Sequence, residues 1–301
     1  MKNVNQILRN EAFFKEYITL YHSPIVRAIR NINRLNKVNL HEGYRLVKKK
    51  ILAKIGDIKI KRNVKSIRSY SSYYNVGEPV DNLKIAVYGC ITNNYDTIKE
   101  PLYVGGDTTY YVFTDKLSEV NGVWHEKLLD CGMYANEANR YYKFHPFDLF
   151  SDYDFAIYID GNVRILSDVS TICSIAAKAK TGIAMHRHHE RECAYQEALA
   201  CKYYKRGNYK RILEQISRFR DDGFPEDFGL CEATIIVYDL KNPTAKVITE
   251  QWWKEYLQSC TKRDQISFPY VLWQNGFGIN DVGDLGNNLM ENPKFLITGH
   301  S

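Results

Sequence analysis

One short motif combines oxygen ligands with a sharp turn directly after an apolar run. Asp160, Gly161 and Asn162 follow the apolar residues 155–159. Carboxylate and amide oxygens suit Mg²⁺ and Mn²⁺, whose remaining positions are filled by phosphate oxygens and water. The glycine lets the backbone turn or approach a ligand closely. The motif therefore indicates a divalent-metal site, with an ordinary structural turn as the alternative.

Two other apolar runs end in polar side chains. Thr92 follows residues 84–91, and Asp115 follows residues 110–114. A carboxylate in this position can bind a ribose hydroxyl or a base, whereas a helix N-cap or a turn is the competing interpretation. Ligands of open α/β sheets bind outside the carboxyl ends of the strands. We therefore expect Thr92, Asp115 and Asp160 to contact a nucleotide or its phosphates at one sheet edge.

Histidine and arginine are concentrated at residues 186–191, which read HRHHER. Adjacent histidines on a strand point to opposite faces, so we do not expect them to bind one metal ion together. Arg187 and Arg191 suit a phosphate or a carboxylated sugar, because guanidinium groups bind such anions through two hydrogen bonds. This segment therefore predicts an anion contact, with Arg187 at the strand end.

A second group of polar residues lies in the C-terminal third. Asp264 and Gln265 follow an aromatic helical stretch that contains Trp252 and Trp253. Polar groups among aromatic faces are typical of a sugar pocket, although Asp264 capping the next helix is equally consistent. Glu232, which precedes a further apolar run, is a candidate carboxylate on the acceptor side.

Several common motifs are absent from the sequence. It contains no G-x-G-x-x-G, no G-x-x-x-x-G-K-[ST] and no G-x-S-x-G. The first two absences argue against a Rossmann dinucleotide site and a P-loop, and the third argues against an α/β-hydrolase nucleophile.

The elements that must position these residues alternate along the chain. Short apolar runs at 84–92, 110–115, 155–160, 182–186 and 233–238 predict buried strands. Helical patterns lie near 119–131, 167–179, 190–220 and 244–260. This alternation predicts an α/β fold with a mixed, mainly parallel sheet and helices on both faces.

Length and composition indicate a globular chain. The 301 residues are 45% hydrophobic and 25% charged, and no apolar run approaches the roughly 20 residues of a membrane-spanning helix. The seven cysteines are dispersed without a C-x-x-C pair, which favours reduced thiols in the cytosol.

The charge is unevenly distributed. Residues 1–70 contain 17 Lys and Arg against 4 Asp and Glu, whereas the rest of the chain contains 24 basic and 31 acidic residues. We therefore divide the chain into a basic helical segment with a connector, residues 1–80, and a body, residues 81–301. The basic segment either packs on the body or lies on an anionic membrane surface; nucleic-acid binding is disfavoured.

An ordered series of motifs resembles a known family. The motifs are YKFHP at 142–146, YIDGN at 158–162, HR at 186–187, YQEA at 195–198, WW at 252–253 and RDQISF at 263–268. Together they resemble the glycosyltransferase-like family of bacteria and plants of the TOD/MUCI type, over about residues 84–275. More distantly, the layout is similar to the retaining family 8 glycosyltransferases.

The resemblance implies a GT-A fold that binds a UDP-sugar and Mn²⁺. The metal-binding D-x-D of family 8 would correspond to Asp160 and Asn162, and its C-terminal metal-binding histidine to His300. Its later Asp-Gln pair would correspond to Asp264 and Gln265. Asparagine at 162 departs from the second aspartate and puts metal affinity in doubt.

These inferences combine into one hypothesis and one alternative. The hypothesis is a cytoplasmic glycosyltransferase, at the inner face of the membrane, that uses Mn²⁺ or Mg²⁺. It transfers a sugar from a nucleotide-sugar donor, with retention, to a glycan or lipid-linked acceptor in bacterial surface polysaccharide synthesis. If the transfer instead inverts configuration, Glu232 or Asp264 is the candidate general base that deprotonates the acceptor hydroxyl. The alternative is a non-catalytic sugar-nucleotide fold, tethered to its partners by the basic helices.

Overall fold

The computed structural model describes residues 73–117, 122–133 and 135–298. The basic segment 1–70 and His300 therefore lie outside the described residues. The described strands are β1 (Ile85–Ile91), β2 (Thr108–Thr114), β3 (Trp124–Leu128), β4 (Phe155–Ile159), β5 (Val163–Ile165), β6 (Ile183–Arg187), β7 (Cys231–Asp239), β8 (Gly283–Asp284) and β9 (Phe295–Ile297). The described helices are α4 (Ala135–Phe144), α5 (Pro146–Leu149), α6 (Cys173–Lys178), α7 (Ala194–Tyr204), α8 (Tyr209–Asp221), α9 (Pro243–Ser259) and α10 (Asp264–Gln274).

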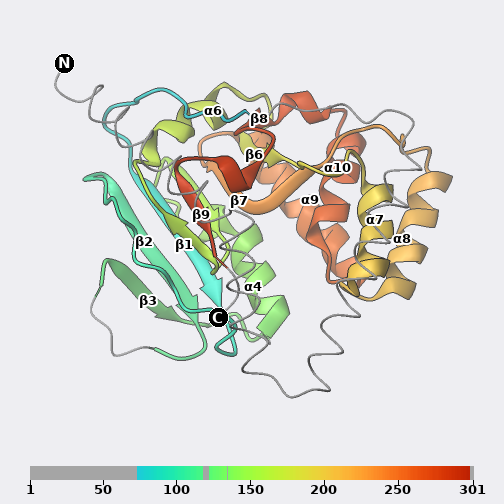
Figure 1. Ribbon diagram of the computed structural model, residues 1–301, viewed down its shortest axis with the longest axis horizontal. Coiled ribbons are helices and arrows are strands. Elements are labelled where there is room, and N and C mark those ends of the chain that lie inside the picture. Colours follow the sequence, from blue (N-terminus) through green and yellow to red (C-terminus); the bar gives the residue numbers. More distant parts are fainter. Residues whose placement is uncertain (1–72, 118–121, 134, 299–301) are drawn as a thin grey trace, which may run out of the picture.

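A seven-stranded sheet forms the centre of the described chain. Its order is β3-β2-β1-β4-β7-β6-β8, and β5 pairs with β9 in a separate two-stranded sheet. The central strands run parallel except β7, which is antiparallel to both β4 and β6. Figure 1 shows β1, β2 and β3 at one side of the molecule and α7 and α8 at the other.

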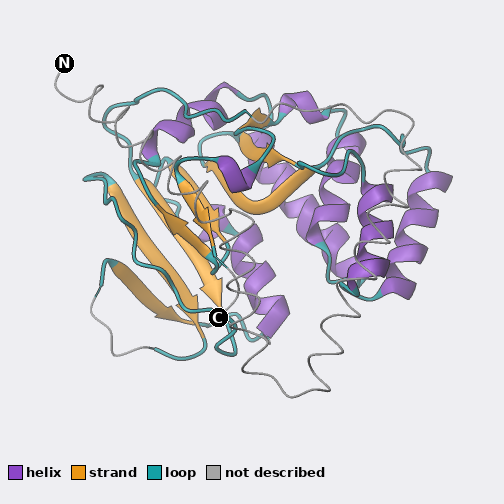
Figure 2. Ribbon diagram, in the orientation of Figure 1, coloured by secondary structure: helices purple, strands orange, loops and turns teal. Residues whose placement is uncertain are grey.

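Helices cover both faces of the sheet, because its central strands are apolar on both sides. On one face, Tyr88, Tyr158 and Tyr238 pack in a cluster with residues of α4, α9 and α10. On the other face, Val87 and Ile157 pack with α6 and the β5–β9 sheet. Figure 2 shows the longer C-terminal helices grouped together beside the strands. The predicted fold class, α/β with a mainly parallel sheet, is confirmed.

Two helical predictions need correction, and some helices were not predicted. The stretch 119–131 contains the strand β3, in which Trp124 is buried against Tyr110 while most of the strand is polar, so its apolar pattern is weak. The predicted helix 190–220 is two helices, separated where Lys205 and Gly207 adopt positive φ angles of 53° and 67°. Helices α4, α5 and α10 lie outside the predicted helical stretches, although a helix after Asp264 was one of the two interpretations of that residue.

None of the helices in the described part of the chain is both long and apolar enough to cross a membrane.

Candidate functional site

The carboxyl ends of three neighbouring strands meet at one edge of the sheet. Thr92 follows β1, Asp115 follows β2 and Asp160 follows β4, and these three strands are adjacent and parallel. The backbone N–H of Asn93 donates to Asp115 Oδ2 at 2.7 Å, which joins the loops after β1 and β2. The structure therefore brings together the three side chains that sequence reasoning placed at this edge.

Asp160 and Asn162 keep oxygen atoms available beside this edge. Tyr158 Oη donates to Asp160 Oδ1 at 2.9 Å, and no described residue hydrogen-bonds to Oδ2. The backbone N–H of Thr298 donates to Asn162 O at 2.8 Å, while Asn162 Nδ2 donates to Thr298 O at 3.3 Å. The Oδ1 atom of Asn162 therefore accepts no hydrogen bond from a described residue. Two hard oxygen donors fit Mg²⁺ or Mn²⁺.

The loop after β1 packs closely against Gly161. A Cβ atom built on Gly161 would lie 3.0 Å from Cβ of Asp96 and 3.0 Å from Cδ1 of Ile91. A larger residue would push this loop away from Asp160. Close packing therefore explains why position 161 of the DGN motif is a glycine, which the sequence alone did not show.

Asp264 is held in a buried group of charges. Lys143 Nζ lies 2.6 Å from Asp264 Oδ2, and Arg140 Nε lies 3.1 Å from the same atom. Burial raises the pKa of Asp264, but Arg140, Lys143 and Arg263 outweigh it, so the pKa lies below its usual value. The carboxylate is bound by these cations, and α10 has no side-chain hydrogen bond at its N-cap, Arg263.

Asp160 and Asp264 belong to one cluster, although they lie on separate elements. Lys143 Nζ, which is bound to Asp264, also lies 5.0 Å from the centroid of the Tyr158 ring. Tyr158 in turn donates to Asp160. We call Arg140, Lys143, Tyr158, Asp160 and Asp264 the Asp160–Asp264 cluster.

Sequence reasoning missed the two cations of this cluster. Arg140 and Lys143 lie three residues apart on α4, and therefore on one face of that helix. Burial lowers the pKa of Lys143, and the nearby carboxylates offset this only in part. The sequence feature that could have indicated them is the pair of basic residues, three positions apart, in an aromatic stretch.

Gln265 and Trp252 flank Asp264 in different environments. Gln265 is half-buried and makes no hydrogen bond to a described residue, so its amide is available to a ligand. Trp252 is fully buried, and its Nε1 donates to the backbone oxygen of Asp264 at 2.9 Å. Trp252 is therefore a core residue that fixes the start of α10.

Arg187 is engaged within the fold. Its Nη2 donates to Val282 O at 2.9 Å and its Nη1 to Cys231 Sγ at 3.3 Å. Arg191 Nε lies 2.6 Å from Glu197 Oε2, in a buried ion pair. Both guanidinium groups therefore have protein partners in this structure.

Glu232 lies with two histidines at the start of β7. His189 Nδ1 is 2.8 Å from Glu232 Oε1, and His188 Nε2 is 3.8 Å from the same oxygen. The two imidazole rings are stacked, with an interplanar angle of 3°. The expectation that adjacent histidines diverge was wrong here, because both lie beyond the end of β6, where strand alternation does not apply. Ligand atoms of the three residues lie within 4.8 Å of one another.

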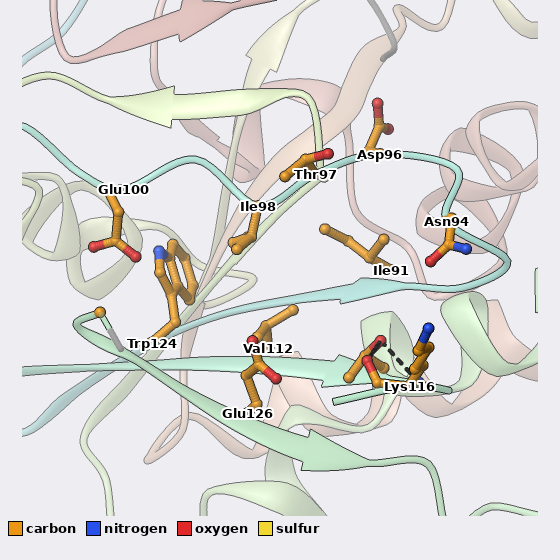
Figure 3. A pocket seen from close by; sticks show the side chains of 12 residues that line it. Ile91, Asn94, Asp96, Thr97, Ile98, Glu100, Val112, Lys116, Trp124 and Glu126 are labelled. Carbon is orange, nitrogen blue, oxygen red and sulfur yellow. Dashed lines mark hydrogen bonds between the residues drawn. The ribbon is translucent and has the colours of Figure 1, made fainter. Parts of the chain in front are cut away.

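A cavity of about 390 Å³ opens beside the β1–β2–β3 part of the sheet. Its lining includes Ile91 from β1, Val112 from β2, Trp124 from β3, and Asp96 and Glu100 from the loop after β1 (Figure 3). Its walls are partly apolar and partly polar, as is typical of small-molecule sites.

The fold and these features define an α/β protein whose polar groups converge at the carboxyl edge of its sheet. Residues 72–280 match the family model TOD1/MUCI70, glycosyltransferase-like domain, and the chain belongs to that family. The family predicted from the sequence is therefore confirmed. A search of curated proteins found no match.

Two solved structures are similar to this chain at low sequence identity. The first is the apo structure of WbbM, described as bifunctional, with 13% sequence identity and a TM-score of 0.40. It covers 67% of this chain, which spans 40% of the WbbM chain. The second is an active-site mutant of LgtC, with 13% sequence identity and a TM-score of 0.38. The match covers 62% of this chain and 70% of the LgtC chain.

Proposed function

We propose that this protein is a glycosyltransferase that uses a nucleotide-sugar donor, most simply a UDP-sugar. The observation that carries the proposal is the Asp160–Asp264 cluster, at the sheet edge where α/β folds bind ligands. Membership in a glycosyltransferase-like family supports the same reaction class. The acceptor we propose is a glycan or a lipid-linked sugar in bacterial surface polysaccharide synthesis.

In this proposal the nucleotide binds at the ends of β1 and β2. Thr92 and Asp115 supply polar contacts there, and the hydrogen bond from Asn93 to Asp115 holds the two loops together. The neighbouring cavity of about 390 Å³ offers apolar surface as well as polar groups.

A divalent ion, Mn²⁺ or Mg²⁺, would be held by Asp160 and Asn162, with His300 as a further predicted ligand. Thr298, two residues before His300, is hydrogen-bonded to Asn162, which supports this ligand set. When bound, such an ion neutralises the charge that develops on the leaving diphosphate. Arg187 stays a predicted diphosphate contact, for which it must exchange a present partner such as Val282 O.

Asp264 and Gln265 are proposed to contact the donor sugar. Arg140 and Lys143 keep Asp264 ionised, so its negative charge can stabilise an oxocarbenium-like centre. The same cations make Asp264 a weak base, because its pKa lies below the usual value. The family 8 resemblance favours retention, but whether the reaction retains or inverts configuration is a separate question from the reaction class.

The proposed location is the cytoplasmic face of a membrane that contains anionic lipids. The excess of basic residues in segment 1–70 supports it, since each Lys or Arg near such a surface contributes about 1 kcal/mol. Sedimentation with phosphatidylglycerol-containing vesicles should carry the full chain down, and a variant that lacks residues 1–70 should stay in solution. Equal binding of both proteins would contradict the proposed contact.

A non-catalytic sugar-nucleotide fold is the second candidate, and Asn162 favours it, because an amide binds metal more weakly than a carboxylate. Calorimetry with UDP and Mn²⁺, followed by UDP release from a panel of UDP-sugars, separates the two candidates. Asp160→Ala should abolish UDP release and leave thermal unfolding intact, whereas Asp152→Ala, at an exposed aspartate, should change neither. Wild-type UDP release by Asp160→Ala would remove Asp160 from the mechanism.

A further inference from the structure

A carboxylate–histidine pair lies beside the proposed donor site and is not explained by donor binding. Glu232, at the start of β7, is 9% exposed, and its Oε1 lies 2.8 Å from His189 Nδ1. An ionised carboxylate can only accept a hydrogen bond, so Nδ1 carries the proton. The lone pair of the neutral imidazole is then on Nε2, and the His189 side chain is 31% exposed.

Both ring nitrogens of the neighbouring His188 are engaged within the protein. Its Nδ1 accepts hydrogen bonds from the backbone N–H groups of Glu190 and Arg191, both at 3.1 Å. Its Nε2 faces the Arg191 guanidinium at 2.7 Å. Burial, together with the charge of Arg191, lowers the pKa of His188 well below the usual value, so the ring is neutral.

These contacts make the group a poor metal site, although three ligand atoms converge. A cation would compete with the Arg191 charge, and it would need lone pairs of His188 and Glu232 that already accept hydrogen bonds. Proton transfer at His189 Nε2 uses the one ring nitrogen of the two imidazoles that takes part in no hydrogen bond with a described residue.

The pair borders the same sheet edge as Asp160. The backbone N–H of Asp160 donates to Thr234 O at 3.0 Å, and Glu232 precedes Thr234 by two residues on β7. Two strand residues span roughly 7 Å. Glu197 then connects this region to α10, since it pairs with both Arg191 and Arg263, at 2.6 and 2.7 Å.

We propose that His189 is the general base that removes the proton from the attacking hydroxyl, with Glu232 as its positioning residue. The proposal rests on the proposed glycosyl transfer. As the oxygen of the attacking hydroxyl bonds to the anomeric carbon, its proton passes to His189 Nε2. The bond from that carbon to the diphosphate breaks, and the electron pair leaves with the diphosphate. A base on the acceptor side favours attack opposite the leaving group and therefore inversion, which differs from the retention implied by the family 8 resemblance.

The charges around His189 set its basicity. The hydrogen bond to Glu232 raises the pKa of His189, and the charge of Glu190, whose Oε1 lies 3.7 Å from Nε2, acts in the same direction. Burial and the charge of Arg191 lower it. His188 stacks on the ring and is neutral. The net pKa of His189 is above its ordinary value, and a stronger base removes the proton of a hydroxyl more readily.

The test measures UDP release from UDP-glucose and UDP-galactose with Mn²⁺ and water as the acceptor. His189→Asn keeps an N–H for Glu232 but removes the base, and it should lower kcat by roughly 100- to 10,000-fold with little change in KM. The acid limb of the wild-type pH profile should disappear in this variant. Glu232→Gln should move that limb to lower pH, and His125→Asn, at an exposed histidine on β3, should change neither quantity.

Specific results would overturn the proposal. A kcat of His189→Asn within threefold of wild type, or an acid limb that both variants leave unmoved, removes His189 from the reaction. So does retained configuration of the first-formed sugar, read by proton NMR before mutarotation. If the wild-type protein neither binds UDP nor releases it from a donor, the proposed function fails and this inference fails with it. Wild-type turnover with an unaffected His189→Asn contradicts this inference alone.

Discussion

The buried pair of Lys143 and Asp264 provides a sharp test of how the site is held together. Lys143 Nζ is 2.6 Å from Asp264 Oδ2, and the two side chains are 2% and 5% exposed. Lys143→Met keeps most of the side-chain volume and removes the charge. The Asp264 carboxylate then stays buried with Arg140, at 3.1 Å, as its remaining ion-pair partner within 4 Å in the described chain.

The expected loss of stability follows from the desolvated charge. Removing one partner of a buried ion pair destabilises a protein by about 3–5 kcal/mol. Arg140 still compensates part of the Asp264 charge, so we expect the lower end, about 3 kcal/mol. For a domain of 150–250 residues, this corresponds to a decrease in Tm of about 6–12 °C.

The chain supplies a matched control on its surface. Lys178 Nζ and Glu78 Oε2 are also 2.6 Å apart, but their side chains are 64% and 71% exposed. Exposed pairs contribute about 0–1 kcal/mol, so Lys178→Met should leave the free energy of unfolding nearly unchanged. The two variants share the chemical change and the ion-pair distance and differ in burial.

The assay is urea unfolding followed by tryptophan fluorescence, together with a double-mutant cycle that adds Asp264→Asn. The double variant should be less destabilised than the sum of the single variants, because each single change leaves a charge unpaired. A loss below about 1 kcal/mol for Lys143→Met, or equal losses for Lys143→Met and Lys178→Met, would refute the argument that desolvation makes this pair important.

Three further predictions concern the loop after β1, the pH dependence of stability and a helix terminus. Gly161→Ala should lower the free energy of unfolding by about 1–3 kcal/mol, because the new Cβ would press on Asp96 and Ile91. It should also weaken UDP binding, as measured by calorimetry. Unchanged UDP affinity would show that the loop position does not matter for binding. Burial lowers the pKa of His186 from 6.5 to about 3. Below pH 6.5 the histidine is therefore protonated in the unfolded chain but stays neutral in the folded chain, and stability is lost as the pH falls. At pH 5 this amounts to about 2 kcal/mol, and His186→Gln should show a correspondingly flatter dependence of unfolding on pH; equal slopes would contradict it. Asn242→Ala removes the side-chain cap of α9 and should cost about 1 kcal/mol in chemical denaturation, whereas no loss would mean that solvent replaces the cap.

Five strands (β1, β2, β4, β6 and β7) and the sheet edge were predictable from local patterns. Each predicted strand was a short apolar run, and such runs are buried on both faces in a parallel sheet. Because parallel strands end at one edge, the positions of Thr92, Asp115 and Asp160 followed from the strand assignments. Their roles in binding stay predictions, as does the division at residue 80.

The contacts between helices were not predictable in the same way. Lys143 and Asp264 are separated by 121 positions, and nothing in either local sequence specifies the other as its partner. The short strand β3 was missed because only Trp124 among its residues is buried. The histidines after β6 were misjudged because the strand ends at Arg187, one residue before them.

The long separation of Lys143 from Asp264 also has a consequence for folding. Contacts between distant segments form against the entropy of a large loop, and folding slows as such contacts increase. Until the start of α10 reaches Arg140 and Lys143 of α4, these opposite charges remain hydrated and apart. The residues proposed to bind the donor therefore come together only in a chain that has closed one of its longest loops. Donor binding is therefore expected only after this long-range contact has formed.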